Sequence, residues 1–172
     1  MTGDGDLRGG YLRQDRLSLA AAAVIVVDMT NDFCHADGVY ARHGADCAPL
    51  RALLPDIAAV MAAARSAGRP VVLCSQFIFR DAAGNAVASP GMVAARPWLG
   101  AEGLAPGSWG TRIVDGLPTP DFTIDKPRAS GFFATSLDLL LRGLGVDTVI
   151  LLGGYTNQCI EATARDAWAL DY

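Results

Sequence analysis

The sequence predicts an α/β fold built on a parallel sheet with helices on both of its faces. Two observations carry this prediction: apolar runs of strand length at 21–28 and 146–152, and an amphipathic helical pattern at 49–67. A strand that is covered on both faces of a parallel sheet is apolar throughout instead of alternating with polar residues. The helix at 49–67 then forms the crossover of a first β-α-β unit, which ends in a strand at 70–75.

The remaining elements continue the alternation of strand and helix. We expect a strand at 122–125, a helix at 135–144, the strand at 146–152 and a last helix at 159–172. Residues 1–17 are rich in glycine and charged residues without periodicity. We therefore expect a flexible leader there and a single domain at 18–172.

The segment 76–121 is punctuated by proline and glycine and contains Trp98 and Trp109. A connection of this length without secondary structure is commonly functional in a small domain. We expect it to form a wall or lid of a pocket. Ordinary packing of the two tryptophans beneath a long loop is the equal alternative.

Composition limits the class of function. The 172 residues carry a net charge of −4, with no cluster of Lys or Arg, so neither nucleic acid nor an anionic membrane is an expected partner. The apolar runs are too short to span a membrane and no signal peptide pattern precedes them, so we expect a cytoplasmic protein that acts on a small molecule. Cys34, Cys47, Cys74 and Cys159 lack C-x-x-C spacing, which argues against a zinc site and a disulfide framework.

Two histidines and three aspartates after the first strand raise the question of a metal site. These residues are Asp32, His35, Asp37, His43 and Asp46. They lack the fixed i, i+4 or short D-x-H spacing that makes a metal motif specific. We therefore expect exposed loop histidines here, and neither a metal nor another cofactor.

Residues 148–166 form a strand, a turn and a helix around Cys159. The apolar strand stops at Gly153 and Gly154, and a helical pattern begins at Cys159. Unpaired N–H groups and the positive end of the helix dipole favour a thiolate at that point. The two glycines free the turn to aim amides at a developing oxyanion. Packing as a small buried hydrophobe is the alternative for a single cysteine.

Two charged residues at other strand ends supply the base and the cation that an activated thiol needs. Asp28 ends the first apolar strand, and Lys126 follows the strand at 122–125. The carboxyl ends of parallel strands lie at the same edge of a sheet, where ligands bind in such folds, so we expect Asp28, Lys126 and Cys159 to meet. A solvated surface charge is the ordinary alternative for Lys126.

Three sequence blocks resemble the isochorismatase-like cysteine hydrolases. They are V-I-V-V-D-M-T-N-D-F, D-K-P-R-A-S-G-F-F-A-T and G-G-Y-T-N-Q-C-I-E-A-T-A-R-D-A, in that family's order and approximate spacing over 21–172. The resemblance implies a doubly wound, mostly parallel sheet of Rossmann type, a catalytic triad of Asp28, Lys126 and Cys159, and a homo-oligomer. It also implies a cis peptide at Gly154–Tyr155 and an oxyanion hole formed by the amides of Tyr155 and Cys159.

Within the family, G-S-W-G at 107–110 and the K-P-R-x-S-G-F-F pattern are most similar to ureidoacrylate, biuret and N-carbamoylsarcosine amidohydrolases. The metal motif of nicotinamidases is missing around Cys47 and Ala48 and after the second strand, so a metal-dependent nicotinamidase is disfavoured. Family members continue into at least one further strand, whereas this sequence ends at Tyr172. We therefore expect the sheet to lack its C-terminal strand or strands.

The resulting hypothesis is a cysteine-dependent amidohydrolase that cleaves a C–N bond of a small amide, ureido or carbamoyl compound through a thioester. Two alternatives stay open: vinyl-ether hydrolysis of the isochorismatase type, which needs no nucleophile, and a non-catalytic interaction protein with the same fold. The candidate substrate contacts are the aromatic Phe33, Trp109 and Phe132, and the cationic Arg128, Arg80 and Arg96. Core packing and solvated surface charges are the respective alternatives.

Overall fold

A four-stranded parallel sheet lies at the centre of the computed structural model, which describes residues 19–172. The leader predicted at 1–17 lies outside these residues. The strands, in the spatial order β5-β2-β1-β6, are β1 (Ala22–Val27), β2 (Val71–Gln76), β5 (Phe122–Lys126) and β6 (Thr148–Gly153). The chain passes from β1 through β2 to β5 in one direction and returns to the other side of β1 with β6. This order confirms the doubly wound parallel sheet.

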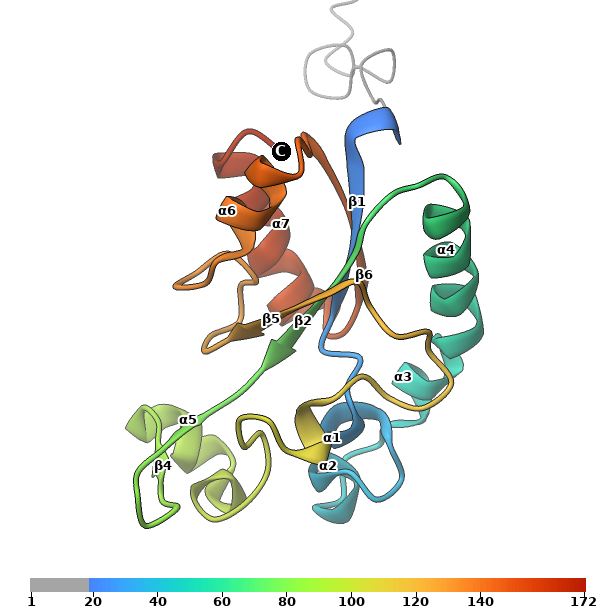
Figure 1. Ribbon diagram of the computed structural model, residues 1–172. Helices are drawn as coiled ribbons and strands as arrows, with labels where there is room; N and C mark the ends of the chain where they lie inside the picture. The colour runs from blue at the N-terminus through green and yellow to red at the C-terminus, as the bar shows by residue number, and fades with distance from the viewer. Residues whose placement is uncertain (1–18) are drawn as a thin grey trace, which may run out of the picture.

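Helices cover both faces of the sheet (Figure 1). The helix α4 (Leu54–Ser66) lies on one face, and α6 (Leu137–Gly143) and α7 (Glu161–Ala169) lie on the other. The pattern at 49–67 predicted one helix, but the structure has two, because α3 (Ala48–Ala52) precedes α4. Pro55 lies in the first turn of α4. Proline is tolerated in a first turn and not inside a helix, which explains the break.

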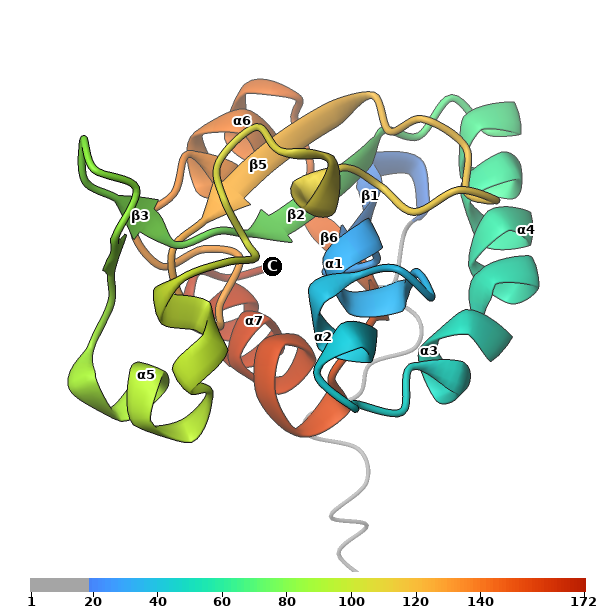
Figure 2. The same cartoon turned by 90° about the horizontal axis from the view of Figure 1, so that it is seen from below.

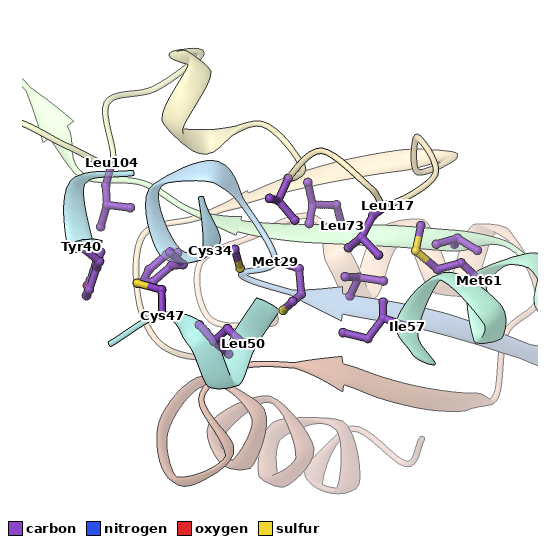
Figure 3. Close-up of a cluster of buried hydrophobic side chains, with 14 of the residues drawn as sticks. Met29, Cys34, Tyr40, Cys47, Leu50, Ile57, Met61, Leu73, Leu104 and Leu117 are labelled. Atoms are coloured by element: carbon purple, nitrogen blue, oxygen red, sulfur yellow. The ribbon is translucent and has the colours of Figure 1, made fainter. Parts of the chain in front are cut away.

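Each face of the sheet supports its own hydrophobic cluster. Alternate residues of β1 point to opposite faces, so Val24 and Val26 join the cluster under α4, whereas Ile25 joins the cluster under α6 and α7. Figure 3 shows the first cluster, which includes Met61 of α4 and Leu73 of β2. All residues of β1 are buried. Burial on both faces is the reason for its uninterrupted apolar sequence.

The strand β6 pairs with β1 on one side only. All of its residues are half-buried, in contrast to those of β1. This exposure agrees with the expectation from the sequence that the sheet lacks its C-terminal strand or strands. Within residues 19–172 no further strand pairs with β6, and its second edge therefore lacks a strand neighbour.

Short elements lie beyond the carboxyl ends of the strands, as Figure 2 shows from below. They are α1 (Asn31–Cys34), α2 (Val39–Arg42), α5 (Pro90–Ala95), the hairpin β3 (Phe79–Arg80) and β4 (Ala86–Val87), and the 3-10 turns η3 (Pro97–Gly100) and η4 (Trp109–Thr111). A further 3-10 turn, η2 (Leu19–Ala21), leads into β1 at the opposite end of the sheet. The segment 76–121 thus contains a hairpin, a helix and two 3-10 turns, where the sequence indicated a loop. Among the helices of the described residues, none has the length and apolarity that crossing a membrane requires.

Arg80 holds this segment together. Its guanidinium donates hydrogen bonds of 2.9 to 3.4 Å to backbone carbonyls of the same segment, those of Gly84, Leu99, Gly100, Ala101 and Gly103. A guanidinium whose donors are used in this way has little capacity left for a ligand. Arg80, expected from the sequence as a candidate for binding a carboxylate, therefore has a structural role instead.

Candidate active site

Asp28, Lys126 and Cys159 form a buried cluster at the carboxyl ends of β1, β5 and β6. The Nζ atom of Lys126 lies 2.9 Å from Oδ2 of Asp28 and 3.4 Å from Sγ of Cys159. The side chains of Lys126 and Asp28 are 0% and 2% exposed. The structure therefore brings together the three residues that the sequence singled out, and Lys126 is not a solvated surface charge.

The neighbouring strand β2 positions Asp28. The residue has a φ of 55°, in the left-handed region that Asp tolerates better than most residues with a side chain. Its N–H donates to the carbonyl of Cys74 at 2.9 Å, and its Oδ1 accepts the N–H of Gln76 at 2.9 Å. The other oxygen, Oδ2, faces Lys126 and has no aligned hydrogen-bond donor among the described residues. One carboxylate oxygen is thus held by the backbone, and the other remains able to accept a proton.

Gln76 is a site residue that the sequence reasoning missed. Its Oε1 lies 3.5 Å from Nζ of Lys126 and 3.8 Å from Sγ of Cys159, so it contacts two members of the cluster. The ammonium of Lys126 also donates to the carbonyl of Arg128 at 3.2 Å. Gln76 is the last residue of β2, and this strand-end position is the signal that would have identified it.

Cys159 lies in a π-helical turn, η5 (Thr156–Ile160), which leads directly into α7. The sequence predicted a helix that begins at Cys159, but the helical structure begins before it. The hydroxyl of Thr163 donates to the carbonyl of Cys159 at 2.6 Å and accepts the N–H of Gly131 at 2.9 Å. These bonds anchor the turn to the loop after β5. Single π-turns of this kind are frequent at functional sites.

The ionisation of the cluster differs from the expectation of a stable thiolate. Burial raises the pKa of Asp28, and the charge of Lys126 opposes this rise without cancelling it. Burial, followed by the negative charge of Asp28, raises the pKa of Cys159 to about 12, although Lys126 acts in the opposite direction. The resting sulfur is therefore a thiol at neutral pH. Desolvation, which the sequence pattern did not include, outweighs the favourable position near a helix start.

Two glycines shape the turn between β6 and η5. Gly153 has a φ of 118°, and a Cβ atom there would lie 2.1 Å from the carbonyl oxygen of Val27, so only glycine fits. A Cβ atom on Gly154 would lie 2.4 Å from the side chain of Leu50. The peptide bond between Gly154 and Tyr155 is cis, which confirms what the family resemblance implied.

A cavity of about 250 Å³ lies beside Cys159. This volume is below the roughly 300–1,000 Å³ of common ligand pockets, so it fits a small molecule. The segment 76–121 contributes part of the wall, as expected. Besides Cys159 the lining includes the aromatic residues Phe33, Tyr40 and Tyr155, the amide residues Gln76 and Gln158, and the arginines Arg96 and Arg128.

Trp109 and Phe132 do not line this cavity, which corrects two of the substrate contacts expected from the sequence. Trp109 packs edge-on against His35, at 5.1 Å between ring centroids, and lines a separate cavity of about 500 Å³. Phe132 is buried in the cluster under α6 and α7, with its ring 5.5 Å from that of Tyr172. Trp109 begins the short 3-10 turn η4 and Phe132 lies in a loop, so no long periodic pattern predicted the direction of their side chains.

The residues considered for a metal site have other partners. Asp32 is buried and accepts the N–H groups of Val39 and Leu104 at 3.2 and 2.7 Å. His43 pairs with Glu102, with 2.6 Å between Nε2 and Oε1. Over residues 19–172, no group of three or more His, Cys, Asp and Glu side chains is arranged to hold a metal ion.

The site combines a thiol, an ammonium and a carboxylate at the carboxyl ends of a doubly wound sheet. This combination is typical of enzymes that use a cysteine nucleophile together with a general base. Comparison with known proteins agrees with this class. The family model for the Isochorismatase domain matches residues 22–172. The chain belongs to this family, the isochorismatase-like hydrolases.

The relatives of the chain include named amidohydrolases. Ureidoacrylate amidohydrolase RutB of Klebsiella pneumoniae is 35% identical over an alignment that covers 93% of this chain and 73% of that protein. Among solved structures, a cysteine hydrolase from Pseudomonas syringae is 29% identical with a TM-score of 0.75, covering 91% of this chain and 70% of that one. N-carbamoylsarcosine amidase from Thermoplasma acidophilum is 27% identical with a TM-score of 0.69, covering 88% and 78%.

The alignments with three curated amidohydrolases cover 64% to 73% of the length of those proteins. Amidohydrolases cleave carbon–nitrogen bonds other than peptide bonds. On the basis of these relatives and the family match, we classify the chain as a hydrolase of this type.

Proposed function

We propose that the protein is a cysteine-dependent amidohydrolase that cleaves a C–N bond of a small amide, ureido or carbamoyl compound through a thioester intermediate. One observation carries the proposal: Sγ of Cys159 lies in the wall of a small cavity and 3.4 Å from the ammonium of a buried Lys–Asp pair. The names of two relatives, ureidoacrylate amidohydrolase and N-carbamoylsarcosine amidase, support this choice of bond.

The first step transfers a proton and forms a bond. Oδ2 of Asp28 takes the proton of the Cys159 thiol while Sγ attacks the substrate carbonyl carbon, and the carbonyl electron pair moves to oxygen. The raised pKa of Asp28 makes this carboxylate a stronger base than an exposed one, which a thiol with a pKa of about 12 requires. Lys126 stabilises the negative charge during the transfer through its contacts with both groups.

The oxyanion then needs donors that are already oriented. We assign this role to the backbone N–H groups of Tyr155, which immediately precedes the turn η5, and of Cys159, which lies within it. One such donor is commonly worth about 3 kcal/mol of transition-state stabilisation. When the tetrahedral intermediate collapses, the C–N bond breaks and the leaving nitrogen takes the proton from Asp28. Water, deprotonated by the same carboxylate, hydrolyses the thioester and regenerates the thiol.

Replacement of the thiol tests the proposal. We expect Cys159→Ala to lose ammonia release from N-carbamoyl-β-alanine, because the acyl acceptor is missing. Cys47→Ala is the matched control, since Cys47 is also buried but does not line the cavity. Intact-mass analysis of the wild type, quenched during turnover, should detect the covalent acyl adduct on the peptide that contains Cys159. Full turnover in Cys159→Ala would refute the mechanism and favour hydrolysis without a nucleophile, such as vinyl-ether hydrolysis.

A cytoplasmic location and a homo-oligomeric assembly remain predictions from the sequence. The oligomeric state can be measured by sedimentation analysis of the purified protein.

A further inference from the structure

Two arginines line the cavity beside Cys159, and they come from different parts of the chain. Arg96 follows α5 in the segment 76–121, with its Cζ atom 5.6 Å from the centroid of the Tyr40 ring. Arg128 follows β5, and its carbonyl accepts the ammonium of Lys126 at 3.2 Å. The cavity thus lies between one arginine of the segment 76–121 and one arginine of the loop that follows β5.

Neither guanidinium has an acidic partner within residues 19–172. The one hydrogen bond of the Arg128 side chain goes to the carbonyl of Pro127 at 2.8 Å, and the guanidinium of Arg96 lies over the ring of Tyr40 without a hydrogen bond to any of the described residues. Other arginines of the described chain do form ion pairs, namely Arg42 with Glu102, Arg65 with Asp121, Arg142 with Asp138 and Arg165 with Glu161. The two arginines at the cavity therefore have unused capacity for an anion.

The charges around the cavity do not balance without a ligand. Among the described residues no acidic side chain lines the cavity, and Asp28, behind the cavity wall, is paired with Lys126 at 2.9 Å. The remaining lining groups beside Arg96 and Arg128 are aromatic, aliphatic, amide or thiol. Two cations at one pocket attract an anion, and the planar fork of Arg matches a carboxylate in a bidentate geometry.

We propose that Arg96 and Arg128 bind a carboxylate group of the substrate, so that the enzyme prefers ureido or carbamoyl acids to neutral ureas and amides. This inference rests on the proposed function and identifies the substrate class of the same cavity. Arg96 lies in the segment 76–121 and Arg128 in the loop after β5. One carboxylate bound by both arginines therefore contacts both walls of the cavity. The substrate carbonyl is then held at Cys159 within the same small volume.

A matched pair of substrates tests the preference. N-carbamoyl-β-alanine and N-propylurea share the ureido group and a similar chain length, but only the first carries a carboxylate. We expect the wild type to show a kcat/KM for the acid that is about 10- to 100-fold higher, the range of a hydrogen bond to a charged group. Arg96→Met and Arg128→Met should each reduce this ratio by about tenfold, mainly through KM. Arg165→Gln is the control, because that exposed guanidinium pairs with Glu161 outside the cavity.

A binding measurement keeps this inference separate from the proposed reaction. Calorimetric titration of Cys159→Ser with N-carbamoyl-β-alanine should detect binding that is weakened about tenfold or more in a protein that also carries Arg96→Met. Binding by Cys159→Ser together with turnover of neither compound by the wild type would overturn the proposed reaction and support the carboxylate site. Equal kcat/KM values for the two compounds would overturn the carboxylate site and leave the proposed reaction intact. The carboxylate site would also be overturned if Arg96→Met or Arg128→Met reduced kcat/KM for the acid and for the neutral compound in the same proportion. That result would indicate a structural role for the arginine.

Discussion

Replacing Lys126 with Met removes the ammonium and keeps an unbranched side chain of similar volume. Because Lys126 and Asp28 are 0% and 2% exposed, the substitution leaves an unpaired carboxylate in a buried site. Breaking a buried ion pair in this way costs about 3–5 kcal/mol of unfolding free energy. The hydrogen bond from the N–H of Gln76 to Oδ1 of Asp28 remains. We therefore expect a loss near the lower end, about 3 kcal/mol at neutral pH.

The loss depends on pH in a defined direction. In the wild type, burial already raises the pKa of Asp28 above its ordinary value of 3.8, and the charge of Lys126 opposes the rise. Without Lys126 the folded-state pKa rises further, so the folded state binds the proton more tightly than the unfolded state. The contribution of Asp28 to the unfolding free energy of the variant then decreases as the pH rises from 3.8 to the folded-state pKa. The Lys126→Met variant is therefore closest to the wild type at low pH.

Urea unfolding followed by circular dichroism measures both effects, at about pH 4.5 and about pH 8. The double variant Asp28→Asn, Lys126→Met is the matched control, because it removes both charges and should recover most of the loss. A loss below about 1 kcal/mol at the higher pH, or a double variant no more stable than the single one, would refute a buried ion pair of this strength.

Three other predictions concern the groups around this pair. Asp28→Asn should abolish ammonia release yet accelerate alkylation of Cys159 by iodoacetamide at about pH 8, because the negative charge of Asp28 raises the pKa of the thiol. Gln76→Glu adds a carboxylate next to the cluster and raises the pKa of the base, so the acid limb of the kcat/KM profile should move to higher pH. Gly153→Ala should cost about 3 kcal/mol of unfolding free energy or more, because a Cβ there would lie 2.1 Å from a carbonyl oxygen of β1. Gly143→Ala meets nothing within 4 Å in the helix α6 and should be neutral or stabilising in the same urea titration.

Each of these predictions has a result that contradicts it. Slower alkylation in Asp28→Asn would mean that this carboxylate does not control the ionisation of the thiol. An unchanged acid limb in Gln76→Glu would mean that Gln76 does not act on the proton-accepting group. Equal unfolding free energies for the Gly153→Ala and Gly143→Ala variants would remove the steric argument for the turn before η5.

Strand ends were the most informative feature of the sequence. Continuous apolar runs identified β1 and β6, and the residues that follow them, together with Lys126, meet in the structure as expected. Gln76 also closes a strand, but an amide gives a weaker chemical signal than a carboxylate, an ammonium or a thiol. The direction of loop side chains was not predictable, because no periodicity relates them to a face. Phe132 and Trp109 were therefore assigned to a cavity that they do not line.

The sequence by itself determined the α/β class and the order of the strands along the chain. It also determined that Asp28, Lys126 and Cys159 lie at strand ends or in the turns after them. Both results follow because hydrophobic periodicity and chain order are local properties. The tertiary structure alone decided the protonation of the thiol, since its pKa depends on burial and on charges brought from distant strands. The tertiary structure also decided that Arg96 and Arg128 line the same cavity without acidic partners. The two cations come together only when the segment 76–121 packs over the carboxyl ends of the sheet.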